Sequence, residues 1–331
     1  MLGSLSMTSV ITNPISNIPV NPKSHTHGWS QLWAEQLNAD INNKCTPNVT
    51  LYNKVYIDHG ANFGGTLNLF GGATKEVFDR INLVASCDNI VSLDWDMPDY
   101  GAMLKKRIGA NTTYEGITEE WCDALSNRLK NVPSLKQEDL DYDSVTLGDS
   151  HTIAFSGHRH RVLRNDGKTL HGALKNGFES MLRGVVPTGV INLCFGSIDI
   201  RHHICRHDDY DLADLVSRYI REGEVLQSKF GVQVLYSCPV PVEWEGRRIP
   251  KSGFFKGTPF YGSSADRRDV TMHFIDELDK QSNGNIIIPP SDWYTMDGET
   301  YARTYMEHGS SFHIAPPFYY RNDWGVTLLG S

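Results

Sequence analysis

The segment Val145-Thr146-Leu147-Gly148-Asp149-Ser150-His151 decides the fold class of this chain. The β-rich run over 143–147 predicts a buried strand, and the Gly-Asp-Ser-His sequence that follows predicts a tight turn into a helix. Open α/β sheets carry their functional side chains at the carboxyl ends of strands, so Ser150 stands where chemistry is expected. The alternative interpretation is that Asp149 or Ser150 only caps the next helix.

Strand and helix patterns alternate on both sides of this segment. Strands are predicted over 54–58, 90–93, 190–195, 232–237 and 285–289, and helices over 29–37, 74–85, 118–129, 211–230 and 269–282. This alternation is typical of a mostly parallel sheet with helices on both faces, so the predicted fold class is α/β. The Gly- and aromatic-rich stretch 243–268 is expected to be a lid or loop region.

The predicted organisation has three parts. Residues 1–27 are rich in Ser, Asn, Pro and Thr and are expected to form an irregular arm. Residues 28–142 are expected to form an N-terminal α/β extension, and residues 143–331 the catalytic unit.

Composition restricts the class of protein. The chain has 331 residues, of which 40% are hydrophobic and 21% charged, and its formal net charge is −8. An acidic chain without a long basic run is not expected to bind nucleic acid generally. No apolar run is long enough to span a bilayer, and the N-terminus lacks the pattern of a signal peptide. We therefore expect a cytoplasmic protein without membrane contact, or one of the host-cell cytoplasm if a phage encodes it.

Three polar phrases occur in order along the second half. They are Gly148-Asp149-Ser150-His151, Phe195-Gly196-Ser197-Ile198-Asp199-Ile200-Arg201-His202-His203-Ile204 and Gly309-Ser310-Ser311-Phe312-His313-Ile314-Ala315-Pro316. Over roughly residues 143–320 this order resembles the SGNH (GDSL-type) hydrolase superfamily. The resemblance implies a flavodoxin-like three-layer sandwich, a serine nucleophile, an oxyanion-hole asparagine in a G-x-N-D block, and a late D-x-x-H block.

The resemblance assigns Ser150 as the nucleophile and His313 as the base, and it aligns Gly196 and Asp199 with the G-x-N-D block. At two positions the chain departs from the family. Ile198 stands in place of the oxyanion asparagine, in a G-x-I-D-x-R variant that also resembles members of the family, and Arg201 or His203 could then aid anion stabilisation. Ser310 stands in place of the triad aspartate, so His313 would work without an acid or borrow a carboxylate, from Asp297 or Glu307.

The chemistry itself requires these residue types. A serine hydroxyl needs a base that accepts its proton, and a histidine of near-neutral pKa serves this purpose. The developing oxyanion needs fixed donors, which loop N–H groups can provide. The candidate catalytic residues are therefore Ser150, His313 and Asp149. Candidate oxyanion or substrate-binding residues are Gly148, Gly196, Asp199, Arg201, His203, His151, His59 and Asn62.

Histidines are dense around the first two phrases. The group comprises His151, His158, His160, His171, His202, His203 and His207, with Asp208 and Asp209 beside it. Imidazole and carboxylate ligands suit zinc, iron or manganese, but the spacings match no specific ligand motif. We therefore predict no metal and no cofactor, and interpret these side chains as polar loop residues in a substrate cleft or at the surface.

The N-terminal part has a glycine-rich signature of its own, His59-Gly60-x-Asn62-x-Gly64-Gly65, after a predicted strand. Glycines there permit a ring of N–H donors for an anion, although plain turns at strand ends explain the pattern equally well. The P-loop lysine and the Rossmann glycine pattern are missing. In style this half is similar to large-phage proteins, including amino acid:DNA transferases that modify thymine bases.

The leading functional hypothesis is ester or acyl-group chemistry through Ser150, either hydrolysis or transfer to a hydroxyl. The substrate would be a small-molecule or glycan acyl compound. A second hypothesis is a phage transferase that hypermodifies DNA bases, for which nucleic acid would be the partner. A third is a non-catalytic, ligand-binding SGNH-like protein that keeps Ser150 and His313 only as inherited positions.

Overall fold

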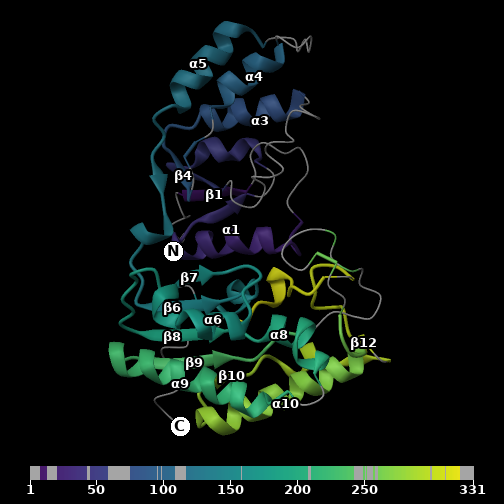
Figure 1. Ribbon diagram of the computed structural model, residues 1–331. Coiled ribbons are helices and arrows are strands. Elements are labelled where there is room, and N and C mark those ends of the chain that lie inside the picture. The colour runs from purple at the N-terminus through teal and green to yellow at the C-terminus, as the bar shows by residue number, and fades with distance from the viewer. Residues whose placement is uncertain are drawn as a thin grey trace, which may run out of the picture. The chain divides into compact units, whose positions relative to one another are not determined.

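The protein consists of two compact units, Met1–Leu140 and Asp141–Ser331 (Figure 1). The computed structural model describes residues 8–12, 21–42, 45–58, 75–94, 96–97, 99–108, 117–157, 159–207, 210–241, 249, 251, 256–257, 260–298, 300–309 and 311–320. Each unit has its own sheet and its own hydrophobic clusters, and both are α/β. The predicted fold class is therefore confirmed.

The first unit is built on a parallel sheet whose described strands lie in the order β2-β1-β3-β4-β5. The strands are β1 (Thr8–Thr12), β2 (Asp40–Asn42), β3 (Lys54–Asp58), β4 (Ile90–Leu93) and β5 (Ser134–Leu135). The helices are α1 (His25–Gln36), α3 (Lys75–Ala85), α4 (Tyr100–Ile108) and α5 (Glu119–Leu129), with short 3-10 turns at Pro47–Leu51 and Gln137–Asp139.

The prediction of a wholly irregular arm over 1–27 is wrong in two places. Thr8–Thr12 forms β1, which pairs with both β2 and β3 inside the sheet, and α1 already begins at His25. Four of the five residues of β1 are β-branched, a run that the Ser-, Asn- and Pro-rich composition around it obscured. Val10 and Ile11 are fully buried, so this segment belongs to the core of the unit.

The second unit has a parallel sheet in the order β10-β9-β8-β6-β7. In chain order both sheets follow the 2-1-3-4-5 arrangement of flavodoxin-like folds. The strands are β6 (Ser144–Gly148), β7 (His160–Arg164), β8 (Val190–Cys194), β9 (Gln233–Ser237) and β10 (Ile286–Ile287). The helices are α6 (Leu170–Asn176), α7 (Phe178–Met181), α8 (Ser197–His202), α9 (Leu212–Phe230) and α10 (Ser264–Ser282).

Short elements complete this unit. They are η5 (Thr152–Phe155), η6 (Ile204–Arg206), η7 (Ser291–Tyr294), η8 (Pro316–Phe318) and a two-stranded antiparallel pair of β11 (Met296–Asp297) and β12 (Thr300–Tyr301). The helix expected after Ser150 is only the 3-10 turn η5. Helix α10 begins inside the expected loop region, at a capping box in which Ser263 and Asp266 each satisfy the other's N–H.

Alternating residues of β8 face different layers. Ile191 and Leu193 pack in the cluster formed with α6, α7, α9 and α10, and α9 and α10 run alongside each other (Figure 1). Val190 and Cys194 belong to the opposite cluster, which contains residues of η5, η7 and the chain after β12. The segment after β12 therefore covers the second face of the sheet. Its polar residue His313 lies close to the end of β6, where it reaches Ser150.

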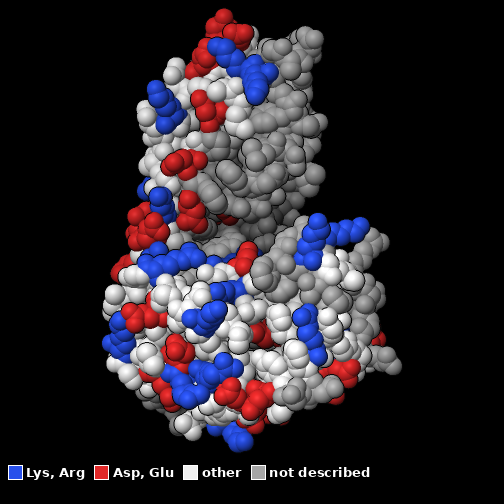
Figure 2. Space-filling model, viewed as in Figure 1, with Lys and Arg blue, Asp and Glu red and all other residues white. Residues whose placement is uncertain are grey.

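Two surface properties bear on possible partners. None of the helices in the described parts combines the length and the apolar character needed to cross a bilayer. On the face of the second unit seen in Figure 2, lysine and arginine side chains are interspersed with aspartate and glutamate.

Gly148 is required by the close approach of β6 and β8. A Cβ atom at this position would overlap the carbonyl oxygen of Cys194 on the neighbouring strand. We expect Gly148→Ala to lower the free energy of unfolding by roughly 1–3 kcal/mol, because backbone rather than a flexible side chain has to move. Denaturant titration measures this change. Gly309→Ala, at a position with open space around the glycine, is the control and should leave stability unchanged.

Candidate active site

Ser150 lies in a tight turn immediately after β6. The Asp149 N–H donates to the carbonyl of Cys194 at 3.0 Å, which ties the turn to the end of β8. One carboxylate oxygen of Asp149 accepts the N–H of His151 at 2.9 Å, across Ser150. Because the backbone on both sides of the serine is held in this way, its hydroxyl has a defined position at the carboxyl edge of the sheet.

The hydroxyl of Ser150 contacts a histidine from the far end of the chain. His313 Nε2 lies 3.1 Å from Ser150 Oγ, although 163 positions separate the two residues. This distance is within the range expected for a nucleophile and its general base.

Glu307 lies on the other side of the same imidazole. Its Oε2 is 3.5 Å from His313 Nδ1, and only 17% of the His313 side chain and 11% of the Glu307 side chain remain exposed. The hydroxyl of Ser311 donates to the same carboxylate oxygen at 3.0 Å and accepts the N–H of His313 at 3.0 Å. Ser150, His313 and Glu307 therefore lie in the order in which a nucleophile, a base and an acid would stand.

The carboxylate beside His313 is that of Glu307, and it does not come from position 310, where the D-x-x-H block has its aspartate. Ser310 lies outside the described residues, and Asp297, the other carboxylate considered, is exposed on β11. Glu307 and His313 face each other because the chain folds back on itself here. Met306 and Ile314 form an antiparallel bridge, and the Glu307 N–H donates to the carbonyl of His313 at 3.0 Å.

Hydrophobic packing holds this folded segment against the sheet. Met306 and Ile314 are each 1% exposed and belong to the same cluster as Phe155 and Trp293. The Tyr320 N–H also donates to the carbonyl of Ala154 in η5 at 2.8 Å. Since η5 directly follows the serine turn, the same contacts that cover the sheet bring His313 to Ser150.

Aromatic rings border His313, and a guanidinium lies over one of these rings. The ring centroid of Phe312 is 4.3 Å from that of His313, and the centroid of His151 is 5.0 Å from it. The guanidinium carbon of Arg201 lies 4.0 Å from the centroid of Phe312. The structure thus brings the predicted residues His151 and Arg201 together with Ser150 and His313.

Asp199 has a different position from that of an oxyanion-hole residue. Its carboxylate accepts the N–H groups of Leu170 at 2.6 Å and His171 at 3.2 Å, so it caps the first turn of α6. His203 is half-buried beside His202, and burial, then Arg206, lowers its pKa. The predicted candidates His59 and Asn62 lie outside the described residues.

Backbone donors for an oxyanion are present at the serine turn. Gly196 follows β8, the neighbour of β6, and has a φ of +110°, which disfavours any other residue. Among the described residues, the N–H groups of Ser150 and Gly196 have no hydrogen-bond acceptor. Both lie at the sheet edge where negative charge would develop on a carbonyl attacked by Ser150.

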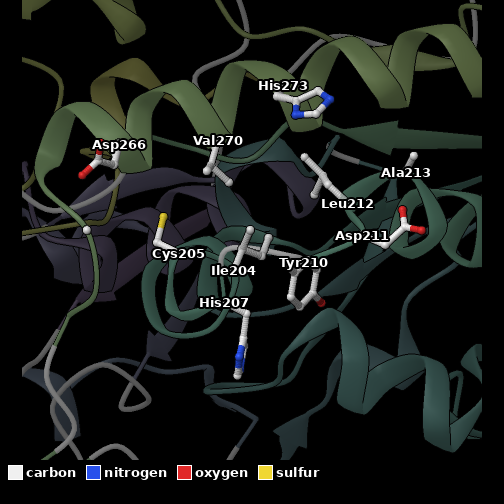
Figure 3. A pocket seen from close by; sticks show the side chains of 11 residues that line it. Ile204, Cys205, His207, Tyr210, Asp211, Leu212, Ala213, Asp266, Val270 and His273 are labelled. Carbon is white, nitrogen blue, oxygen red and sulfur yellow. The ribbon is translucent and has the colours of Figure 1, made fainter.

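The described residues contain no group of three or more histidine, cysteine, aspartate or glutamate side chains arranged to hold a metal ion. A cavity of about 610 Å³ lies elsewhere on the carboxyl edge, between η6, the start of α9 and α10 (Figure 3). Ile204, Leu212 and Val270 form its apolar centre. Neither Ser150 nor His313 lines this cavity.

Burial of Asp149 makes the stability of the protein depend on pH. Burial raises the pKa of this carboxyl to about 7, against the opposing effects of the His151 N–H and Arg201. The unfolded pKa of an aspartate is about 3.9, so Asp149 binds its proton more tightly in the folded state than in the unfolded state. The protein therefore becomes less stable as Asp149 ionises, which happens as pH rises from about 4 through 7.

We expect the wild type to lose on the order of a few kcal/mol more free energy of unfolding between pH 4 and 8 than Asp149→Asn, which cannot ionise. Urea unfolding of both proteins across this pH range measures the difference. Parallel stability curves would contradict the assignment of a raised pKa to Asp149.

A scan against protein-family models and a search of curated proteins find no match for this chain.

Proposed function

We propose that the second unit is a serine hydrolase or acyltransferase of SGNH-like type, acting on ester or acyl groups through Ser150 and His313. The observation that carries this proposal is the series Ser150–His313–Glu307, with atom separations of 3.1 and 3.5 Å at the carboxyl edge of a parallel sheet. The flavodoxin-like strand order and the order of the sequence phrases also support it. Glu307 takes the role that an aspartate three residues before the histidine has in that superfamily.

In the proposed reaction, Ser150 Oγ attacks the carbonyl carbon of the substrate while His313 Nε2 accepts the hydroxyl proton. The carbonyl π electrons move to oxygen, and the N–H groups of Ser150 and Gly196 stabilise the resulting oxyanion. The oxyanion collapses, the bond to the alkoxide leaving group breaks, and the leaving group takes the proton from His313. An acyl ester of Ser150 remains.

The second half of the reaction regenerates the serine. Water or an acceptor hydroxyl attacks the acyl ester while His313 again accepts a proton, which it then returns to Ser150 Oγ. Water as acceptor gives hydrolysis, and an alcohol or glycan hydroxyl gives acyl transfer. Glu307 stabilises the imidazolium in both halves and selects the tautomer with the proton on Nδ1.

Covalent labelling tests this function without knowledge of the substrate. A fluorophosphonate probe should react with the wild-type protein at one site, and peptide mass spectrometry should locate the adduct on Ser150. Labelling should be abolished by Ser150→Ala and by heat denaturation. A folded wild-type protein that remains unlabelled, together with no hydrolysis of short-chain nitrophenyl esters, would rule out the proposal.

A further inference from the structure

The imidazole of His151 is buried without a hydrogen-bond partner. The residue is 2% exposed, and neither Nδ1 nor Nε2 has a partner among the described residues. Buried polar groups are nearly always paired, because an unpaired one loses its hydrogen bonds to water without compensation. His160 of the same unit follows this rule, since its Nδ1 lies 2.8 Å from Thr146 Oγ1. His151 is therefore an exception that needs a reason.

The position of His151 suggests the reason. It is the residue after Ser150, its N–H is held by the Asp149 carboxylate, and its ring contacts the rings of His313 and Phe312. Packing thus holds the imidazole beside the base that acts on the serine. Unpaired polar groups that persist at such positions lower stability, and they are typical of sites where a ligand completes the hydrogen bonding.

The charge state of His151 suits a donor rather than a second base. Burial, followed by the nearby His313 and Arg201, lowers its pKa well below 6.5. The ring is therefore neutral at physiological pH and carries a single N–H. A neutral imidazole can donate to a carbonyl oxygen, and it does not place a second cation beside His313 when that residue takes the serine proton.

The site also lacks a side-chain donor where the superfamily has one. Ile198, in place of the asparagine, is buried in α8 and cannot donate a hydrogen bond. Acyl-group chemistry needs fixed donors for the carbonyl oxygen, and each such donor has a large effect on rate. Among the described residues, no group accepts the ring N–H of His151.

We propose that His151 binds the acyl substrate as an uncharged hydrogen-bond donor, with its ring N–H directed to the carbonyl oxygen that becomes the oxyanion. This inference rests on the proposed function and adds a residue to it. The His151 N–H would take over the role that the asparagine side chain has in the oxyanion hole of proteins with a G-x-N-D block.

Two phenylalanine variants test the inference. His151→Phe keeps an aromatic ring and removes only an unpaired polar edge, so its melting temperature should equal or exceed that of the wild type. Its kcat for a nitrophenyl ester should fall roughly tenfold to 100-fold, with little change in KM. His160→Phe, the matched control, leaves the Thr146 hydroxyl unpaired. It should lower the melting temperature and leave kcat unchanged at temperatures where it is folded.

A spectroscopic measurement on the wild type keeps the test independent of how the variants fold. Phosphonylation of Ser150 places a phosphoryl oxygen where the oxyanion would form. The imidazole ¹⁵N and ¹H signals of His151, assigned by their loss in His151→Gln, should shift on phosphonylation. No shift, or a His151→Phe variant whose kcat/KM stays within about twofold of wild type, overturns the inference. If folded wild-type protein is neither phosphonylated at Ser150 nor able to hydrolyse the nitrophenyl ester, the proposed function fails as well, so the two failures are distinguishable.

Discussion

Replacing Ser150 by alanine is expected to lower the rate of ester hydrolysis by at least ~10³-fold, down to the residual level that oxyanion donors and binding provide. The substitution removes the attacking oxygen, so no acyl-enzyme can form. Among the described residues, the Ser150 hydroxyl forms a side-chain hydrogen bond with His313 and with no other residue. We therefore expect the variant to keep its fold. Steady-state rates on a nitrophenyl ester, with circular dichroism for folding, measure both effects.

Ser180→Ala is the matched control for this prediction. Ser180 is an exposed serine of the same unit, on α7, and its hydroxyl donates to backbone carbonyls at the start of the helix region, those of Asn176 and Gly177. Its loss should leave the rate unchanged. If Ser150→Ala keeps the wild-type rate, Ser150 is not the nucleophile, and a non-catalytic, ligand-binding role becomes the better hypothesis.

Glu307→Gln is expected to reduce kcat by roughly 10²–10⁴-fold while KM changes little. In the proposed mechanism, the carboxylate stabilises the imidazolium that His313 becomes and keeps the proton of the neutral ring on Nδ1. The glutamine amide carries no charge to stabilise the imidazolium, and it can donate as well as accept a hydrogen bond, so it does not fix the tautomer. The carboxylate also accepts the Ser311 hydroxyl, so the variant should be checked for folding by its melting temperature.

Two further variants separate this role from general effects of charge. Asp297→Asn removes the other candidate carboxylate, which is exposed on β11, and should leave kcat unchanged. Ser310→Asp restores the acid at the position where the superfamily has one. Because Glu307 already lies at His313 Nδ1, we expect no gain from Ser310→Asp. Unchanged activity of Glu307→Gln together with a gain in Ser310→Asp would show that the acid is missing from the wild type.

The sequence by itself determined the α/β class and much of the second sheet. Strands β6, β8 and β9 are short apolar runs, fully or almost fully buried, with turn residues after them, and such local patterns need no knowledge of distant contacts. The turn at Gly148 was also recognisable locally. The phrases around Ser150 and His313 indicated the pair that the structure holds 3.1 Å apart.

Only the tertiary structure decided which carboxylate serves His313 and what Asp199 does. The partner of His313 depends on the antiparallel pairing of Met306 with Ile314, whose register no local pattern reveals. Asp199 caps α6, a helix far from it in the chain, because the fold brings the N–H groups of Leu170 and His171 to its buried carboxylate. β1 was hidden in a polar arm for a similar reason, since a strand of five residues gains its stability from β2 and β3 on either side. Local propensity marks where elements and turns can form, whereas long-range packing and pairing choose which side chains meet.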